Sequence, residues 1–151
     1  MGTAISKNKN LVDGIFPHYN AKLTDFGLAK SFQQTGLSGI TMVGDVAGTI
    51  AYMPPEQVRD FKEVRPPSDI YAIGMTAYSL MTGAHALGLD SRSGISETVK
   101  AIFEKPFIPI SQRMPQIPSR IATVVEKALS KDAQSRWRTA GEMRRELLNA
   151  S

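Results

Sequence analysis

A chain of 151 residues, 42% hydrophobic and 21% charged, is sized and composed for one folded domain, which excludes a disordered or low-complexity protein. Its net charge of +4 comes from scattered Lys and Arg without a dense basic stripe, so we expect no nucleic-acid partner. The sequence has no cysteine, which excludes disulfides and thiolate metal sites.

The first part of the chain is expected to hold a short β-hairpin followed by a long loop. The opening residues MGTAISKNKN lack the apolar segment of a secretory signal, so we expect a cytoplasmic protein. Residues 11–12 and 21–23 are predicted as two short strands around turn-forming Asp, Gly and Pro residues. Residues 28–50 are rich in Gly, Ser and Thr without periodicity, which is typical of a long functional loop.

The uncharged run over residues 70–89 is about as long as the ~20 residues that cross a bilayer. Its many polar side chains favour a helix buried in a protein core instead, so we expect no membrane span. Ser68 and Asp69 are predicted to cap this helix, which ends near Gly83 and is covered by other segments on nearly every side. Its apolar positions recur at helical spacing: Ile70, Ile73, Ala77, Leu80 and Met81.

Three further helices are predicted towards the C-terminus. Ser96 can cap a short helix that runs through Phe103, and Ser119 can open another. The sequence TAGE has capping-box spacing and predicts a last helix with Met143 and Leu147 facing inward. The helix after Ser119 carries one apolar stripe: Ile121, Val124, Val125, Ala128 and Leu129.

Several polar residues near these helices are given ordinary structural interpretations. His18 and His85 have no metal-binding spacing and are interpreted as loop histidines. Trp137 is expected in core packing or at a surface groove. A loose basic cluster is typical of a solvated helix face: Arg136, Arg138, Arg144 and Arg145.

Four motifs follow one another along the chain: DFG at residues 25–27, GTIAYMPPE at 48–56, SDIYAIG at 68–74 and KDAQSRW at 131–137. Their order and spacing resemble the C-terminal lobe of eukaryotic-type, bacterial-style Ser/Thr protein kinases. The resemblance covers nearly the whole chain, from the end of the catalytic loop to the last helix, so residues 1–151 are expected to form one partial kinase domain. It implies a mainly α fold with a short β-hairpin at the N-terminal end, and with the N-terminal lobe absent.

The resemblance implies a magnesium site. Asp25 matches the metal-binding aspartate of the family, and Asn10 matches the asparagine at the end of its catalytic loop. Gly27 would let the backbone after Asp25 reorient. ATP and Mg²⁺ are therefore the cofactors that the family implies, because divalent metal neutralises charge on the transferring phosphoryl group.

Residues 28–50 stand where the family has its activation loop. Thr49 matches the family threonine that faces the catalytic aspartate in kinases acting on Ser or Thr. Four hydroxyl residues in the loop are candidate phosphorylation sites, because added charge can order a loop against basic side chains; for each one, an ordinary loop hydroxyl is the alternative. They are Ser31, Thr35, Ser38 and Thr41.

Three matched residues have structural roles in the family. Glu56 stands where the family has a carboxylate that pairs with a distant buried arginine, and Arg136 matches that arginine. Asp69 matches the aspartate that hydrogen-bonds the backbone of the catalytic loop. A simple helix cap is the alternative for the same residue.

The catalytic loop departs from the family pattern. Lys7 matches its lysine, but Ile5 stands where the family has its general base aspartate, and isoleucine cannot accept a proton. The glycine-rich strands, strand lysine and helix glutamate that hold ATP also have no counterpart in these 151 residues.

Two functions follow from this mixture of matches and departures. The first is a Ser/Thr protein kinase that transfers the ATP γ-phosphate to protein Ser or Thr, here a truncated lobe expected to be inactive alone. The alternative is a non-catalytic, pseudokinase-like docking or scaffold module. Either would meet a protein substrate or a cognate kinase through the activation loop and the segment after it.

Overall fold

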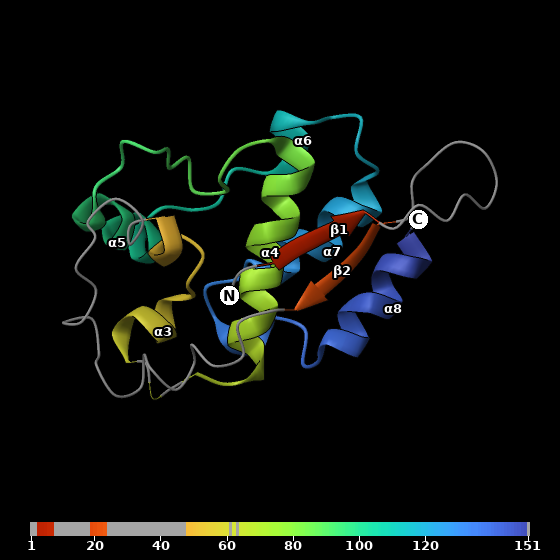
Figure 1. Ribbon diagram of the computed structural model, residues 1–151, viewed down its shortest axis with the longest axis horizontal. Coiled ribbons are helices and arrows are strands. Elements are labelled where there is room, and N and C mark those ends of the chain that lie inside the picture. Colours follow the sequence, from red (N-terminus) through yellow and green to blue (C-terminus); the bar gives the residue numbers. More distant parts are fainter. Residues whose placement is uncertain (1–2, 8–18, 24–47, 61, 63, 151) are drawn as a thin grey trace. The chain divides into compact units, whose positions relative to one another are not determined.

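The computed structural model describes residues 3–7, 19–23, 48–60, 62 and 64–150. The chain divides into two compact units, residues 1–39 and residues 40–151. The first unit contains the strands, and the second contains the helices (Figure 1).

The described part of the first unit is a two-stranded antiparallel hairpin. Strand β1 (Thr3–Lys7) pairs with β2 (Tyr19–Leu23), and Ile5 lies opposite Ala21. The predicted second strand, residues 21–23, falls inside β2. Strand β1 was not predicted, and the predicted strand at residues 11–12 lies outside the described residues.

The second unit is helical. Its elements in chain order are α3 (Pro55–Arg59), α4 (Pro66–Thr82), α5 (Ile95–Glu104), α6 (Ile110–Arg113), α7 (Ser119–Ala128), the 3₁₀ turn η3 (Ala133–Ser135) and α8 (Ala140–Ala150). The long helix α4 contacts α6, α7 and η3, while α7 also packs against α8 and α3 packs against α5 (Figure 1). This unit confirms the predicted mainly α fold.

Helix α4 begins earlier than predicted. Pro66 occupies its first position, where the fixed φ of proline suits a helix and its missing N–H is not needed. Ser68, predicted as a cap, lies one turn inside, and its Oγ accepts a hydrogen bond from the Arg65 amide at 3.4 Å. The helix ends as expected at Gly83, whose φ of 68° is a left-handed conformation that glycine adopts without strain.

The predicted inward face of α4 is wrong in part. Ile73 is 44% exposed and Leu80 is 70% exposed, so this helix is not covered on nearly every side. After Asp69 the helix carries no charged residue, and its hydroxyl side chains lie among the apolar ones, so its periodicity could not select one face. The packed face is the one that approaches α7 and the core: Ile70, Tyr71, Gly74, Met75 and Tyr78.

The later helices agree with prediction more closely. Helix α5 covers the expected residues, although Gly94 precedes it as N-cap instead of Ser96. Helix α7 starts at Ser119 and buries Val124 and Val125 of its predicted stripe. Strong amphipathic periodicity thus located these helices well, whereas single capping residues were less informative.

The start of α8 is fixed by reciprocal side-chain bonds. Thr139 Oγ1 accepts from the Glu142 amide at 3.1 Å, and a Glu142 carboxylate oxygen accepts from the Arg138 amide at 2.9 Å. This is a one-residue variant of the predicted capping box. Met143 is buried and Leu147 is partly buried, as the pattern indicated.

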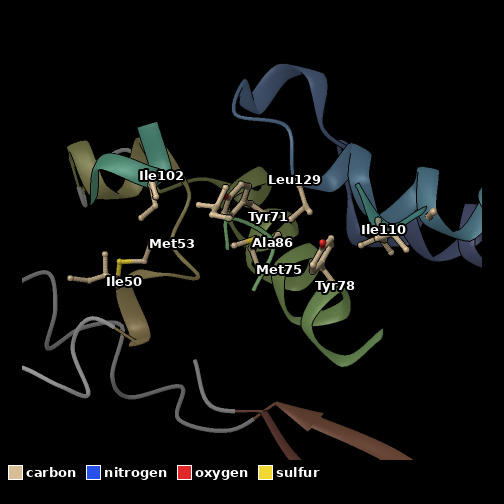
Figure 2. Packing of buried hydrophobic residues seen from close by; sticks show 13 residues of the cluster. Ile50, Met53, Tyr71, Met75, Tyr78, Ala86, Ile102, Ile110 and Leu129 are labelled. Carbon is tan, nitrogen blue, oxygen red and sulfur yellow. The ribbon is translucent and has the colours of Figure 1, made fainter. Parts of the chain in front are cut away.

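One main hydrophobic cluster lies at the centre of the second unit. In Figure 2, Tyr71, Met75 and Tyr78 extend from α4 into this cluster, with Ile50 and Met53 at one end and Ile110 at the other. Within the described ranges, no helix is both long enough and apolar enough to traverse a bilayer.

Candidate functional site

The segment GTIAYMPPE, residues 48–56, is anchored in the core by several buried side chains. Ile50 and Met53 are buried, whereas Thr49 is exposed. Two tight turns shape the backbone: the Tyr52 amide donates to the Thr49 carbonyl at 3.2 Å, and the Met53 amide donates to the Ile50 carbonyl at 2.9 Å. The buried residues therefore hold a turn that presents Thr49 at the surface.

The segment ends in α3 with a carboxylate that meets a distant arginine. Arg136 Nη1 donates to Glu56 Oε1 at 2.7 Å, and Nη2 donates to Oε2 at 2.9 Å. The pair is bidentate, because two parallel N–H groups of the planar guanidinium donate to the two carboxylate oxygens. The Arg136 side chain is fully buried, so the structure brings Glu56 and Arg136 together inside the protein.

Further polar groups complete this ion pair. Ser68 Oγ donates to Glu56 Oε1 at 2.9 Å. Burial pushes the pKa of Glu56 up, but the hydrogen bonds from Arg136, its own backbone amide and Ser68 outweigh that effect and leave the pKa below its ordinary value. The carboxylate is therefore held ionised.

Arg136 also contacts the ring of Tyr71, with its Cζ atom 4.9 Å from the ring centroid. Burial raises the pKa of the Tyr71 phenol to about 12, although the charge of Arg136 opposes the rise. Arg136 was grouped with a basic cluster on a solvated face. Its burial corrects that interpretation, because its charge is compensated inside the protein.

Trp137, the next residue in the chain, packs against the core, which was one of the two positions expected for it. Its indole Nε1 donates to the Val124 carbonyl at 2.9 Å. Lys127 lies over the same ring, with Nζ 3.6 Å from the centroid. Trp137 therefore joins α7 to the turn before α8.

Two further residues that were matched to the family lie in described elements. Asp69 is exposed in the first turn of α4, and Ile5 lies within β1. Within the described ranges, no three acidic or histidine residues are grouped to hold a metal ion. The remaining predicted site residues lie outside the described residues: Asn10, Asp25, Gly27, Ser31, Thr35, Ser38 and Thr41.

His85, predicted to be an ordinary loop histidine, contacts the segment at residues 48–56. Its Nε2 atom lies 2.9 Å from the Ala51 carbonyl oxygen, and its Nδ1 atom accepts from the Leu87 amide at 3.2 Å. Burial lowers the pKa of His85, as does Arg113, while the bond to Ala51 raises it. No spacing signal could find this residue, because Ala51 lies 34 positions away in the chain.

A model of the protein kinase domain matches residues 7–148. The chain belongs to the protein kinase family. That membership confirms the resemblance inferred from the four motifs.

Three bacterial proteins illustrate the similarity. The chain is 36% identical over 127 residues to serine/threonine-protein kinase PknB of Mycobacterium tuberculosis, covering 84% of this chain and 20% of that protein. It is 35% identical to PknB of Mycolicibacterium smegmatis, with the same coverage. It is 33% identical over 132 residues to serine/threonine-protein kinase PrkC of Bacillus subtilis, covering 87% of this chain and 19% of that protein. The kinase chain therefore spans about a fifth of the length of these curated relatives.

Proposed function

We propose that these 151 residues supply the substrate-docking half of a Ser/Thr protein kinase domain. The observation that carries the proposal is the buried pair of Glu56 and Arg136, which ties the segment at residues 48–56 to the core while Thr49 stays exposed. A surface held this firmly can receive a protein segment with little further ordering, which lowers the entropic cost of binding. The exposed Thr49 would then lie near the substrate hydroxyl.

The magnesium and ATP site belongs to the same proposal. Carboxylate and amide oxygens are ligands that Mg²⁺ accepts, so the donor types of Asp25 and Asn10 fit the ion. When bound, Mg²⁺ would neutralise charge on the phosphates of ATP. Gly27 would give the backbone beside Asp25 its freedom to reorient, and Asp69 would support the loop around Asn10.

These residues on their own are not expected to transfer phosphate. Ile5 stands where a proton acceptor is needed, and an aliphatic side chain cannot orient or deprotonate a hydroxyl. The test is an assay of the homogeneous 151-residue chain with labelled ATP, Mg²⁺ and protein substrates, beside an active Ser/Thr kinase as positive control. Phosphorylation that requires Mg²⁺ and copurifies with this chain would contradict the expectation.

Docking is tested separately from catalysis. We expect the chain to bind peptides that contain Ser or Thr in preference to matched peptides that contain Tyr. Thr49→Ala should weaken binding, whereas Thr123→Ala, at an exposed threonine of α7, should not. Equal binding of Ser, Thr and Tyr peptides would contradict a substrate-docking role for Thr49. Equal effects of Thr49→Ala and Thr123→Ala would contradict it as well.

The second candidate is a non-catalytic docking or scaffold module, favoured by Ile5 at the base position. Under this reading the partner is a cognate kinase, which would bind the segment at residues 48–56 and phosphorylate the loop before it. The candidate phosphorylation sites would be Ser31, Thr35, Ser38 and Thr41. The test is binding of a purified related kinase to this chain, with Ser and Thr peptides added as competitors. If the kinase binds and the peptides do not displace it, this function is favoured over the first.

A further inference from the structure

The contacts of His85 define one protonation state. The Leu87 amide is a donor, so Nδ1 must offer a lone pair to it at 3.2 Å. The Ala51 carbonyl is an acceptor, so Nε2 must carry the proton that it donates across 2.9 Å. Both bonds exist together only when the imidazole is neutral with its proton on Nε2.

A second pair of contacts holds the next residue of the same segment. The Tyr52 ring meets the His85 ring edge to face, with centroids 5.4 Å apart and planes at 85°. The Tyr52 hydroxyl donates to Ser79 Oγ at 3.3 Å, which joins the segment to α4. Residues 51 and 52 are therefore held by α4 and by the loop after it, on contacts separate from the Glu56 pair.

We propose that His85 is a positioning residue that holds residues 48–53 of the docking segment through the Ala51 carbonyl while its ring is neutral, and releases them when the ring is protonated. The significance of this for substrate binding depends on the proposed docking function. The contact itself does not, because it is a property of the fold.

Protonation breaks the arrangement for a simple geometric reason. A proton on Nδ1 would point at the Leu87 N–H, so two donors would face each other and the ring would have to turn away. Arg113 of α6 adds a positive charge that disfavours the imidazolium, and Tyr52 is the titratable group that meets the ring. The folded state prefers neutral His85, so the contact is complete above the ordinary pKa of 6.5 and is lost as pH falls through the lower folded value.

The first measurement is the tautomer of His85 by ¹⁵N NMR of the whole chain. The chain has two histidines, so the His85 signals are those that disappear in His85→Gln. At pH 7.5 we expect Nδ1 to be unprotonated and Nε2 to carry its proton. An Nδ1-protonated tautomer, or a charged ring at that pH, would overturn the proposal.

The second measurement is the hydrogen-exchange protection of the Tyr52 and Met53 amides, whose hydrogen bonds form the turns of the segment. Loss of one neutral hydrogen bond is worth about a fivefold change, so His85→Ala should lower protection about fivefold at pH 7.5. Glutamine has both a donor and an acceptor, so His85→Gln should keep protection within about twofold. In the wild-type chain protection should fall as pH drops below 6.5, and in His85→Gln it should not.

Two outcomes contradict the positioning role: unchanged protection in His85→Ala, or a fall at low pH that persists in His85→Gln. Val125→Ala serves as control, because a buried truncation lowers global stability without changing the pH at which the segment is released.

Peptide binding then separates this proposal from the docking function. If the wild-type chain binds no peptide at any pH, the docking function fails, while the exchange data still decide the role of His85. If peptides bind and His85→Ala leaves their affinity unchanged, His85 does not position the docking surface. The expected result is a loss of about fivefold in affinity for His85→Ala and recovery in His85→Gln.

Discussion

Arg136 uses every hydrogen-bond donor that its side chain has. The guanidinium has five N–H groups. Nε donates to the Ser130 carbonyl at 2.7 Å, and beyond its bonds to Glu56 the group also reaches the Pro67 carbonyl at 2.9 Å and the Lys131 carbonyl at 3.1 Å. A buried cation with all its donors satisfied is compatible with the fold, whereas the same cation with one partner removed is costly.

Breaking this pair should cost far more than breaking an exposed one. Arg136→Met keeps most of the side-chain volume but leaves the Glu56 carboxylate without its cation, so we expect a loss of about 3–5 kcal/mol in the free energy of unfolding. Arg136→Lys keeps the charge without the planar fork and should lose less. Urea unfolding followed by circular dichroism measures both variants.

The matched control is Arg92→Ala, which removes a pair with Asp90 whose side chains are 90% and 52% exposed. Exposed pairs contribute about 0–1 kcal/mol, so this variant should be nearly as stable as the wild type. Equal losses in Arg136→Met and Arg92→Ala would contradict the importance of the buried pair.

Glu56 should also make the free energy of unfolding fall at acidic pH. Its pKa is lower in the folded protein than its ordinary 4.5, so the unfolded state binds a proton more readily. The stabilisation is present above about pH 4.5 and is lost as pH falls through the folded pKa. Unfolding measured between pH 3 and pH 7 should show this loss in the wild-type chain and a shallower dependence in Glu56→Gln, while parallel curves for the two proteins would contradict it.

At the scale of elements, a single glycine determines how closely α4 approaches α7. A Cβ atom on Gly74 would lie 2.8 Å from Ala128 Cβ and 3.2 Å from Leu129 Cδ2. The Ala128 side chain has no rotamer to change, so the two helices would have to separate. The contact between α4 and α7 thus depends on small residues on both helices.

Gly74→Ala should therefore destabilise the protein although alanine is the better helix former. Overpacking costs about 1–3 kcal/mol, against a propensity gain of about 1 kcal/mol. The same change at Gly141 of α8 is the control, because a Cβ atom there would lie 3.8 Å from Thr139 Oγ1, an ordinary van der Waals contact. We expect a lower melting temperature for Gly74→Ala and an equal or higher one for Gly141→Ala; equal shifts would contradict the close approach.

At the scale of the whole molecule, the two units differ in what they contain. Among the described residues, the buried ion pair, the main hydrophobic cluster and a smaller cluster of Ile70, Val124, Ala128 and Met143 all lie in the second unit. A unit with its own core can fold by itself. The stability of the second unit should therefore depend little on residues 1–39.

A polypeptide of residues 40–151 tests this independence. We expect a cooperative thermal transition with a free energy of unfolding within about 1 kcal/mol of the 151-residue chain. Arg136→Met should destabilise the shorter polypeptide by the same amount as the longer one. A broad, non-cooperative transition in the shorter polypeptide would show that residues 1–39 are part of the folding unit.

The sequence by itself determined the features that depend on local pattern or on motif order. The stripe of α7, the left-handed end of α4 at Gly83 and the capping bonds of α8 are local, because the residues that make them are a few positions apart. The four ordered motifs were enough to place the chain among protein kinases, and residue types matched to the family also predicted the meeting of Glu56 with Arg136.

Only the tertiary structure decided which face of α4 is packed and what His85 does. A helix without a distinct polar face has no preferred side until its neighbours are in place, and Gly74 could be recognised as a contact only with Ala128 beside it. The bond from His85 to Ala51 likewise joins residues 34 positions apart, and no sequence motif relates the two positions. The physical reason is the same in each case: local propensity acts over a few residues, whereas burial and hydrogen-bond partners are supplied by segments that only folding brings together.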